Sequence, residues 1–217
     1  FTMHAANFLK TRGGYLNTGV WSNKAMEAAS FFGETYEVAS SKADGFSYIP
    51  KADTFAVKEG TDYVYMTSNN TIHGTEWKTF PSFDVPLFCD MSSDFLSRPV
   101  DVKQFDFIYA GVQKNVGPAG VVVAIIKDDL LKNVCRDLPV MMQYKTYVGH
   151  DSTYNTPPVF NIYFVNKVSH WLDRNGGLAA MAKCNQEKAA IVYDAIDSSD
   201  GFYRGHAAVD SRSLMNV

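Results

Sequence analysis

The stretch FDFIYAGVQKNVGPAGVVVAIIK, residues 105–127, decides the fold class of this chain. Residues 105–112 lack a strict alternation of apolar and polar side chains, which is typical of a strand buried on both faces, and residues 120–127 are nearly all apolar and β-branched. Strand-like and helix-like segments alternate along the rest of the chain. The sequence therefore predicts an α/β protein with a largely parallel, buried sheet.

Other segments show the same two kinds of pattern. Three short apolar runs predict strands at residues 36–40, 63–67 and 86–89. Helical spacing of apolar residues predicts helices at residues 21–32 (ending at Gly33), from Pro157-Pro158 to Asn175-Gly176-Gly177, and at residues 178–196.

Three further segments carry expectations of a different kind. Phe160, Phe164, Val168 and Trp171 share one face of the second predicted helix. Residues 134–154 are predicted to be a long loop, and a loop of that length is often functional. Residues 213–217 have the pattern of an incomplete strand, and the pattern around Phe1 predicts a structured segment. We therefore expect a partial chain.

Composition and charge exclude several classes of protein. The 217 residues are 46% hydrophobic with a formal net charge of −3, so no broad basic surface is expected to hold nucleic acid. The three cysteines form no CxxC pair, which argues against a zinc site and favours a reducing compartment. No apolar run approaches the roughly 20 residues of a membrane span, and no signal peptide is recognisable. We therefore expect a cytoplasmic protein without a metal.

Two charged residues follow buried strands. Asp90 comes after the apolar run at 86–89, and Lys114 lies in the turn after residues 105–112. Ligands of open α/β sheets bind beyond the carboxyl ends of the strands, so the two side chains are expected at one site. A phosphate-binding P-loop fits poorly, because Lys114 precedes its glycines. A lysine in a partly desolvated pocket has a lowered pKa, which suits an amine that forms an imine.

Five segments together resemble one known family. The segment AGVQKNVGPAG (110–120) closely resembles the one that carries the cofactor-binding lysine in the phosphoserine aminotransferases, which use pyridoxal 5'-phosphate (PLP). Four other segments resemble the family in the same order: CDMSSDFLSRPVDV (89–102), YNTPP (154–158), WLDRNGG (171–177) and FYR (202–204). The resemblance extends over essentially the whole chain.

The resemblance implies a fold and a division of the chain. The fold would be a three-layer α/β sandwich around a mostly parallel sheet, like the large domain of aspartate aminotransferase. Residues 1–177 would form most of this PLP-binding domain, and residues 178–217 a connecting helix and the start of a small C-terminal domain. Family members are longer, so a glycine-rich phosphate-binding segment and the residues that recognise the substrate are expected outside this chain. The 217 residues alone are expected to be an incomplete catalyst.

The resemblance also implies a reaction. L-Glutamate would transfer its amino group to 3-phosphohydroxypyruvate, giving O-phospho-L-serine and 2-oxoglutarate in serine biosynthesis. The implied enzyme is a homodimer whose active site takes residues from both subunits.

Seven residues receive roles through the resemblance. Lys114 would hold PLP and move the substrate proton, and Asp90 would face the pyridine nitrogen and keep it protonated. Trp21 would stack on the ring, Thr71 would bond to its oxygen or phosphate side, and Gln113 would contact the phosphate. Asn155 and Thr156 would reach the phosphate bound in the neighbouring subunit.

Each of these residues also has a plain structural interpretation. Trp21 could pack in a core, Asp90 and Thr71 could stabilise turns, and Asn155-Thr156 could cap the following helix. Other readings of the whole chain are an alanine–glyoxylate aminotransferase, a cysteine desulfurase, or a subunit that dimerises without catalysis. A desulfurase needs a mobile catalytic cysteine, whereas Cys89 lies in a predicted strand.

Overall fold

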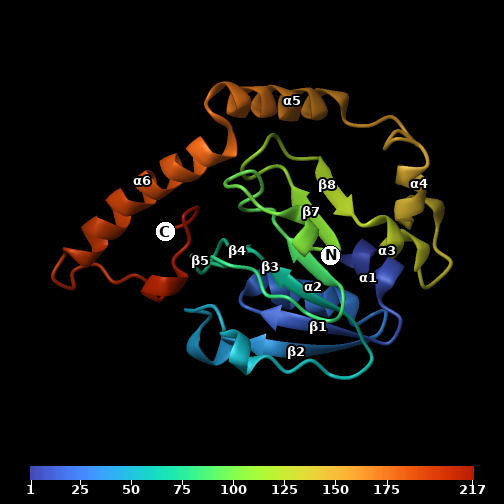
Figure 1. The fold of residues 1–217 in the computed structure, drawn as a ribbon, viewed down its shortest axis with the longest axis horizontal. Coiled ribbons are helices and arrows are strands. Elements are labelled where there is room, and N and C mark those ends of the chain that lie inside the picture. The colour runs from blue at the N-terminus through green and yellow to red at the C-terminus, as the bar shows by residue number, and fades with distance from the viewer.

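The computed structural model describes residues 1–217 and confirms the α/β prediction (Figure 1). Its main sheet has six strands in the order β2-β1-β3-β6-β7-β8. All neighbouring pairs are parallel except β7 and β8, which are antiparallel. The strands are β1 (Arg12–Asn17), β2 (Glu34–Ser40), β3 (Thr61–Thr67), β6 (Leu87–Asp90), β7 (Phe107–Gly111) and β8 (Val122–Ile126). A separate two-stranded hairpin consists of β4 (Asn69–Asn70) and β5 (Thr75–Glu76).

Six α-helices accompany the sheet. They are α1 (Thr2–Phe8), α2 (Val20–Ala29), α3 (Asp128–Lys132), α4 (Tyr144–Val148), α5 (Val159–Arg174) and α6 (Gly177–Asp197). The predicted stop between the last two is confirmed, because Asn175 ends α5 and Gly176 follows with a φ of +90°, a conformation that favours glycine. None of the helices is both long and apolar enough to cross a membrane.

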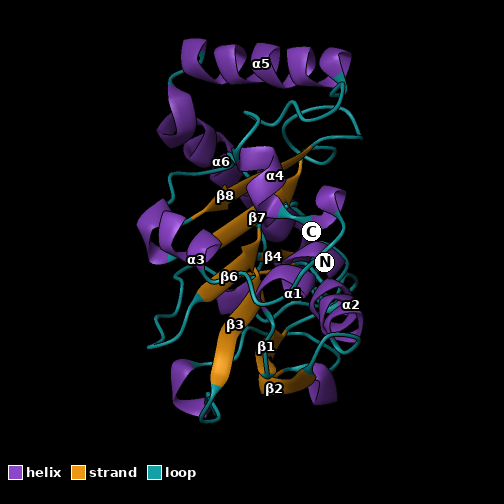
Figure 2. Ribbon diagram, turned by 90° about the vertical axis from the view of Figure 1, so that its right-hand side faces the viewer, coloured by secondary structure: helices purple, strands orange, loops and turns teal.

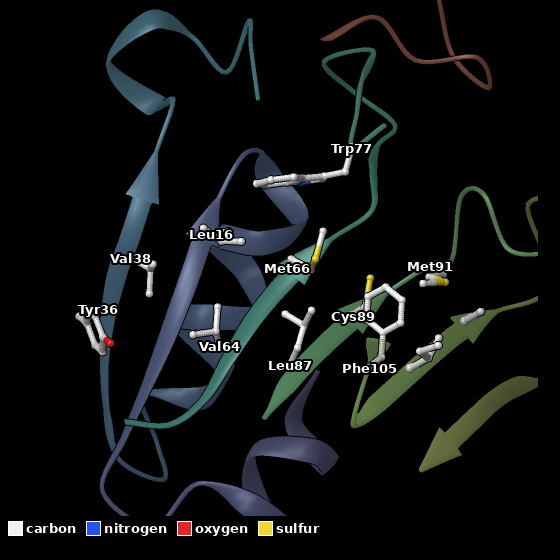
Figure 3. Close-up of a cluster of buried hydrophobic side chains, with 12 residues drawn as sticks. Leu16, Tyr36, Val38, Val64, Met66, Trp77, Leu87, Cys89, Met91 and Phe105 are labelled. Carbon is white, nitrogen blue, oxygen red and sulfur yellow. The ribbon is translucent and has the colours of Figure 1, made fainter. Parts of the chain in front are cut away.

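Each face of the sheet carries its own hydrophobic cluster. Helices α1 and α2 cover one face (Figure 2), where they pack on Tyr15, Tyr63, Tyr65, Phe88 and Phe107. Tyr63 and Phe88 stack there with ring centroids 4.3 Å apart. The opposite face carries twelve buried residues, ten of them labelled in Figure 3, and irregular segments with partly buried side chains such as Phe55, Phe80 and Phe95 cover it. Burying one such aromatic side chain contributes about 1.5–3 kcal/mol.

Helix α5 lies beyond the β8 edge of the sheet in both views, and α6 runs from its end back along the side of the molecule (Figures 1 and 2). Helix α5 touches the body mainly through Val165 near Gly117 and through Asn161, whose amide donates to the carbonyl of Ala119 over 2.6 Å. Phe160 and Trp171 are 68% and 48% exposed. The apolar face predicted for this helix is therefore largely uncovered within the chain.

Several local predictions were wrong. Strand β8 was expected to be buried, but most of it is exposed, with Val122 at 66%. Helix α2 ends at Ala29 instead of residue 32. Residues 134–154 are not one long loop, because α4 lies within them. Residues 213–217 form no strand, and only Arg212 makes an isolated bridge, to Thr75.

Helix α1 and strand β1 were not predicted. Strand β1 contains Gly13-Gly14, a pair more typical of a turn. A Cβ atom at Gly14 would lie 2.6 Å from Cγ2 of Val38 on β2, so this strand needs a glycine for the close approach of its neighbour.

Candidate active site

The candidate site lies at the carboxyl ends of four neighbouring strands. Helix α2 follows β1, the hairpin β4–β5 follows β3, and two turns follow β6 and β7. The four strands are parallel, so these connections all begin at one edge of the sheet. Such an edge is where open α/β sheets bind ligands.

Lys114 lies in the turn after β7, and its amine has two hydroxyl partners. Its Nζ donates to Thr71 Oγ1 over 2.7 Å and to Ser93 Oγ over 3.1 Å. The hydroxyls of Thr71 and Ser93 also bond to each other. The lysine side chain itself is exposed, so the amine is held in place at a surface that a ligand can reach.

Two opposing effects set the pKa of Lys114. Desolvation lowers this pKa below its ordinary value, and the negative charges of Asp90 and Asp94 act in the opposite direction. The net direction is downward, which favours the neutral, nucleophilic amine. The turn that follows Asp90 carries Ser93, whose hydroxyl lies 3.1 Å from the Lys114 amine.

Asp90 is the last residue of β6 and is only 5% exposed. Its Oδ1 accepts the backbone N–H of Ser92 over 2.9 Å. Its Oδ2 accepts the hydroxyl of Tyr109 over 2.9 Å. The two donors hold one carboxylate oxygen each and fix the plane of the group.

The hairpin β4–β5 positions Thr71. Asn70 accepts the backbone N–H groups of His73 and Gly74 at its carbonyl, over 3.2 and 2.9 Å, and this closes a tight turn. Gly74 has a φ of +64°, as the turn requires. Thr71 is the first residue of that turn, which brings its hydroxyl to Lys114 and Ser93.

Trp21 lies in the first turn of α2 and faces the same amine. The Lys114 Nζ is 5.2 Å from the centroid of its ring, a cation–π distance. The indole Nε1 of Trp21 is buried and has no hydrogen-bond partner. The structure thus brings together Lys114, Asp90, Thr71 and Trp21.

The other three predicted site residues are placed differently. Gln113 precedes Lys114 and is exposed, and its amide folds over Gly111, where an added Cβ atom would lie 2.5 Å from Oε1. Asn155 and Thr156 are exposed in the segment before α5, where the Asn155 amide donates only to the carbonyl of Thr156, over 3.4 Å. No contact joins these two residues to the Lys114 cluster within the chain.

Sequence reasoning missed Ser92, Ser93, Asp94 and Tyr109. The Ser92 hydroxyl accepts the backbone N–H of Gly111 over 3.0 Å, which ties the turn after β6 to the end of β7. The only available signal was the position of the polar run Ser92-Ser93-Asp94 directly after a buried strand. Tyr109 gave no signal, because a tyrosine in a predicted strand is typical of packing.

Arg98 has structural partners. Its guanidinium donates to the carbonyls of Trp77 and Lys78, over 2.6 and 3.1 Å, and lies 3.6 Å from a carboxylate oxygen of Glu76.

Comparisons with known proteins place this geometry in a family. The family model for class-V aminotransferases matches residues 12–217. The phosphoserine aminotransferase of Lysinibacillus sphaericus is 49% identical over 220 residues, which cover the whole chain and 61% of that protein. The chain therefore spans about three fifths of the length of the curated relatives it matches.

Solved structures agree with the sequence comparison. One phosphoserine aminotransferase, studied for radiation damage of its Schiff base, superposes with a TM-score of 0.96 at 50% identity, over 98% of this chain and 60% of that one. A PLP-bound phosphoserine aminotransferase from Trichomonas vaginalis superposes with a TM-score of 0.91 at 37% identity, over 98% and 61% of the two chains. An alanine–glyoxylate aminotransferase from Nostoc is 12% identical, with a TM-score of 0.73, so this likeness concerns the fold alone.

Proposed function

Because the chain belongs to the class-V aminotransferase family, we propose that its protein is a phosphoserine aminotransferase that uses PLP. The reaction is transfer of the amino group of L-glutamate to 3-phosphohydroxypyruvate, a step of serine biosynthesis. The observation that carries the proposal is the Lys114 amine, held by Thr71 and Ser93 with a lowered pKa near the buried carboxylate of Asp90. Identity of 49% to a phosphoserine aminotransferase along the whole chain supports the choice of substrates.

The residues at the sheet edge fit PLP. Asp90 offers a buried carboxylate to a cationic ring nitrogen, and the exposed Lys114 amine can bond covalently to an aldehyde. The Trp21 indole offers an aromatic surface beside that amine. With PLP bound, Thr71 would bond to the ring oxygen or phosphate side and Gln113 would contact the phosphate.

Each residue has a separate task in the reaction. When bound, PLP supplies an electron sink for the carbanion that forms at the substrate Cα. Lys114 takes the proton from that Cα and returns one to the product, which its lowered pKa favours at neutral pH. Asp90 would keep the ring nitrogen of bound PLP protonated, and Trp21 would stack on the ring.

The protein is proposed to be a homodimer with a composite site. Asn155 and Thr156 are exposed and have no partner in the Lys114 cluster, which leaves them free to bind the phosphate in a second subunit. The division of the chain at residue 177 into a PLP-binding part and the beginning of a small domain belongs to the same proposal.

Borohydride reduction of the intact native protein tests the cofactor site. Reduction in the presence of PLP is expected to leave a pyridoxyl group on Lys114, which peptide mapping by mass spectrometry detects. The Lys114→Arg variant is the control and should carry no group at this position. Absence of a pyridoxyl adduct on Lys114 in the wild-type protein would rule out the proposed function.

The amino acceptor requires its own assay. With L-glutamate as donor, 3-phosphohydroxypyruvate is expected to react much faster than glyoxylate. Equal rates would favour an alanine–glyoxylate type of reaction. A cysteine desulfurase is disfavoured, because Cys89 is fully buried in β6 and burial raises the pKa of its thiol well above the ordinary value.

A further inference from the structure

A line of two hydroxyl groups, on the half-buried Tyr109 and the buried Tyr65, leads from Asp90 into the sheet. Tyr109 donates to Asp90 Oδ2 over 2.9 Å, and the Tyr65 and Tyr109 hydroxyls are 2.7 Å apart. Asp90 and Tyr109 are register partners on β6 and β7, so their side chains leave the same face of the sheet. Tyr65 reaches this face from β3, on the other side of β6. Three strands thus contribute to one hydrogen-bonded line.

The direction of the hydrogen bonds follows from the carboxylate. An ionised carboxylate only accepts, so the Tyr109 hydroxyl donates to Asp90 and accepts from Tyr65. Burial raises the pKa of both tyrosines well above the ordinary value, so both remain neutral donors. The order is therefore Tyr65 to Tyr109 to Asp90.

His4 of α1 packs against both tyrosines of the line. Its ring lies stacked on those of Tyr65 and Tyr109, with centroids 5.2 and 5.9 Å apart. The histidine is 1% exposed, and burial lowers its pKa well below the ordinary value, so it adds no charge here. Loss of the Tyr109 hydroxyl would remove a hydrogen bond to a carboxylate that is only 5% exposed.

We propose that Tyr109, supported by Tyr65, is a positioning residue that orients the Asp90 carboxylate toward the ring nitrogen of PLP. The proposal rests on the proposed function, since it concerns the same cofactor. It adds that the affinity for PLP depends on two tyrosines that act through the Asp90 carboxylate. Ser92 holds the other carboxylate oxygen through its backbone, so only the Tyr109 bond can be removed by a side-chain change.

The chain contains a matched control for this pair. Tyr15 on β1 and Tyr63 on β3 have hydroxyls 2.8 Å apart, and both side chains are fully buried on the same face. Neither hydroxyl contacts Asp90. Tyr15→Phe therefore removes a buried tyrosine–tyrosine hydrogen bond, as Tyr65→Phe does, but leaves the carboxylate untouched.

The test measures the dissociation constant of PLP and the visible circular dichroism of the bound cofactor in the intact native protein. Tyr109→Phe is expected to weaken PLP binding about tenfold, as fits loss of one hydrogen bond to a charged group, and to change the dichroic band. Tyr65→Phe should weaken PLP binding less, by about two- to threefold, because it removes only the hydrogen bond that Tyr109 accepts from Tyr65. Tyr15→Phe should leave both readouts unchanged.

A double-substitution cycle separates positioning from general damage. In an Asp90→Asn background, Tyr109→Phe should weaken PLP binding by less than about twofold, because its effect passes through the carboxylate. A tenfold loss in that background, or a Tyr109→Phe variant that binds PLP as Tyr15→Phe does, would overturn the proposal.

Borohydride mapping of the wild-type protein distinguishes the two levels of inference. If the wild-type protein carries a pyridoxyl group on Lys114 and Tyr109→Phe does not change PLP binding, the positioning role alone is refuted. No pyridoxyl group on Lys114 would refute the proposed function, and the positioning role with it.

Discussion

Replacing Asp94 with asparagine is expected to flatten the dependence of folding stability on pH. Asp94 is 6% exposed, and burial raises the pKa of its carboxyl to about 7, although the Ser68 hydroxyl and the Arg98 guanidinium 4.0 Å away act in the opposite direction. The ordinary value is 3.8. The folded state therefore binds a proton more tightly than the unfolded state does.

The sign and size of the effect follow from this difference. Because the pKa is higher in the folded state, its contribution to stability is complete below about pH 4 and is lost as the pH rises through about 7. The values 7 and 3.8 differ by about 3, and each tenfold change in proton affinity corresponds to about 1.4 kcal/mol. The largest loss between pH 4 and pH 8 is therefore about 4 kcal/mol.

Urea unfolding of the intact native protein between pH 4 and pH 8 provides the assay. Asparagine has nearly the same shape and does not titrate, so the Asp94→Asn variant should lack the loss attributed to Asp94. Asp84→Asn is the matched control, since Asp84 is exposed and makes no hydrogen bond or salt bridge. If the wild-type and Asp94→Asn profiles run parallel across this range, the burial argument is wrong.

Three other predictions test the site and the sheet. The Asp94→Asn variant should also form the pyridoxyl adduct on Lys114 at lower pH than wild type, because it lacks a negative charge that raises the pKa of the lysine. Borohydride trapping over a pH series measures this pH dependence. A shift to higher pH would contradict the prediction. Thr71→Val removes the nearer acceptor of the Lys114 amine and is expected to slow PLP capture several-fold. The absorbance change after mixing with PLP measures the rate of capture. Thr79→Val, on the exposed surface, is the control. Gly14→Ala should destabilise the protein by about 1–3 kcal/mol in urea unfolding, since its Cβ would meet Val38 Cγ2 at 2.6 Å; an unchanged midpoint would show that β1 and β2 can separate freely.

The sequence was sufficient for five of the six strands of the main sheet, all but β1, and for the two charged groups at the sheet edge. The strands that contain or precede Asp90 and Lys114 are short apolar runs, and a polar residue at the end of such a run lies at the carboxyl edge of a parallel sheet in any α/β fold. The end of helix α5 could also be predicted from the local sequence, because Gly176 adopts a conformation that glycine favours. These features depend on neighbours in the chain.

Tertiary structure decided what depends on neighbours in space. Strand β1 contains Gly13-Gly14, and only neighbours in space explain the pair. A Cβ atom at Gly14 would meet Val38 on β2, and one at Gly13 would lie 3.2 Å from the Tyr63 ring on β3. The antiparallel direction of β8 and its exposure depend on which elements pack nearby, which periodicity does not report. Tyr65 and Tyr109 look like ordinary strand residues until the register places them beside Asp90. A hydrogen bond between strands joins atoms that are distant in sequence, so only the folded chain can reveal it.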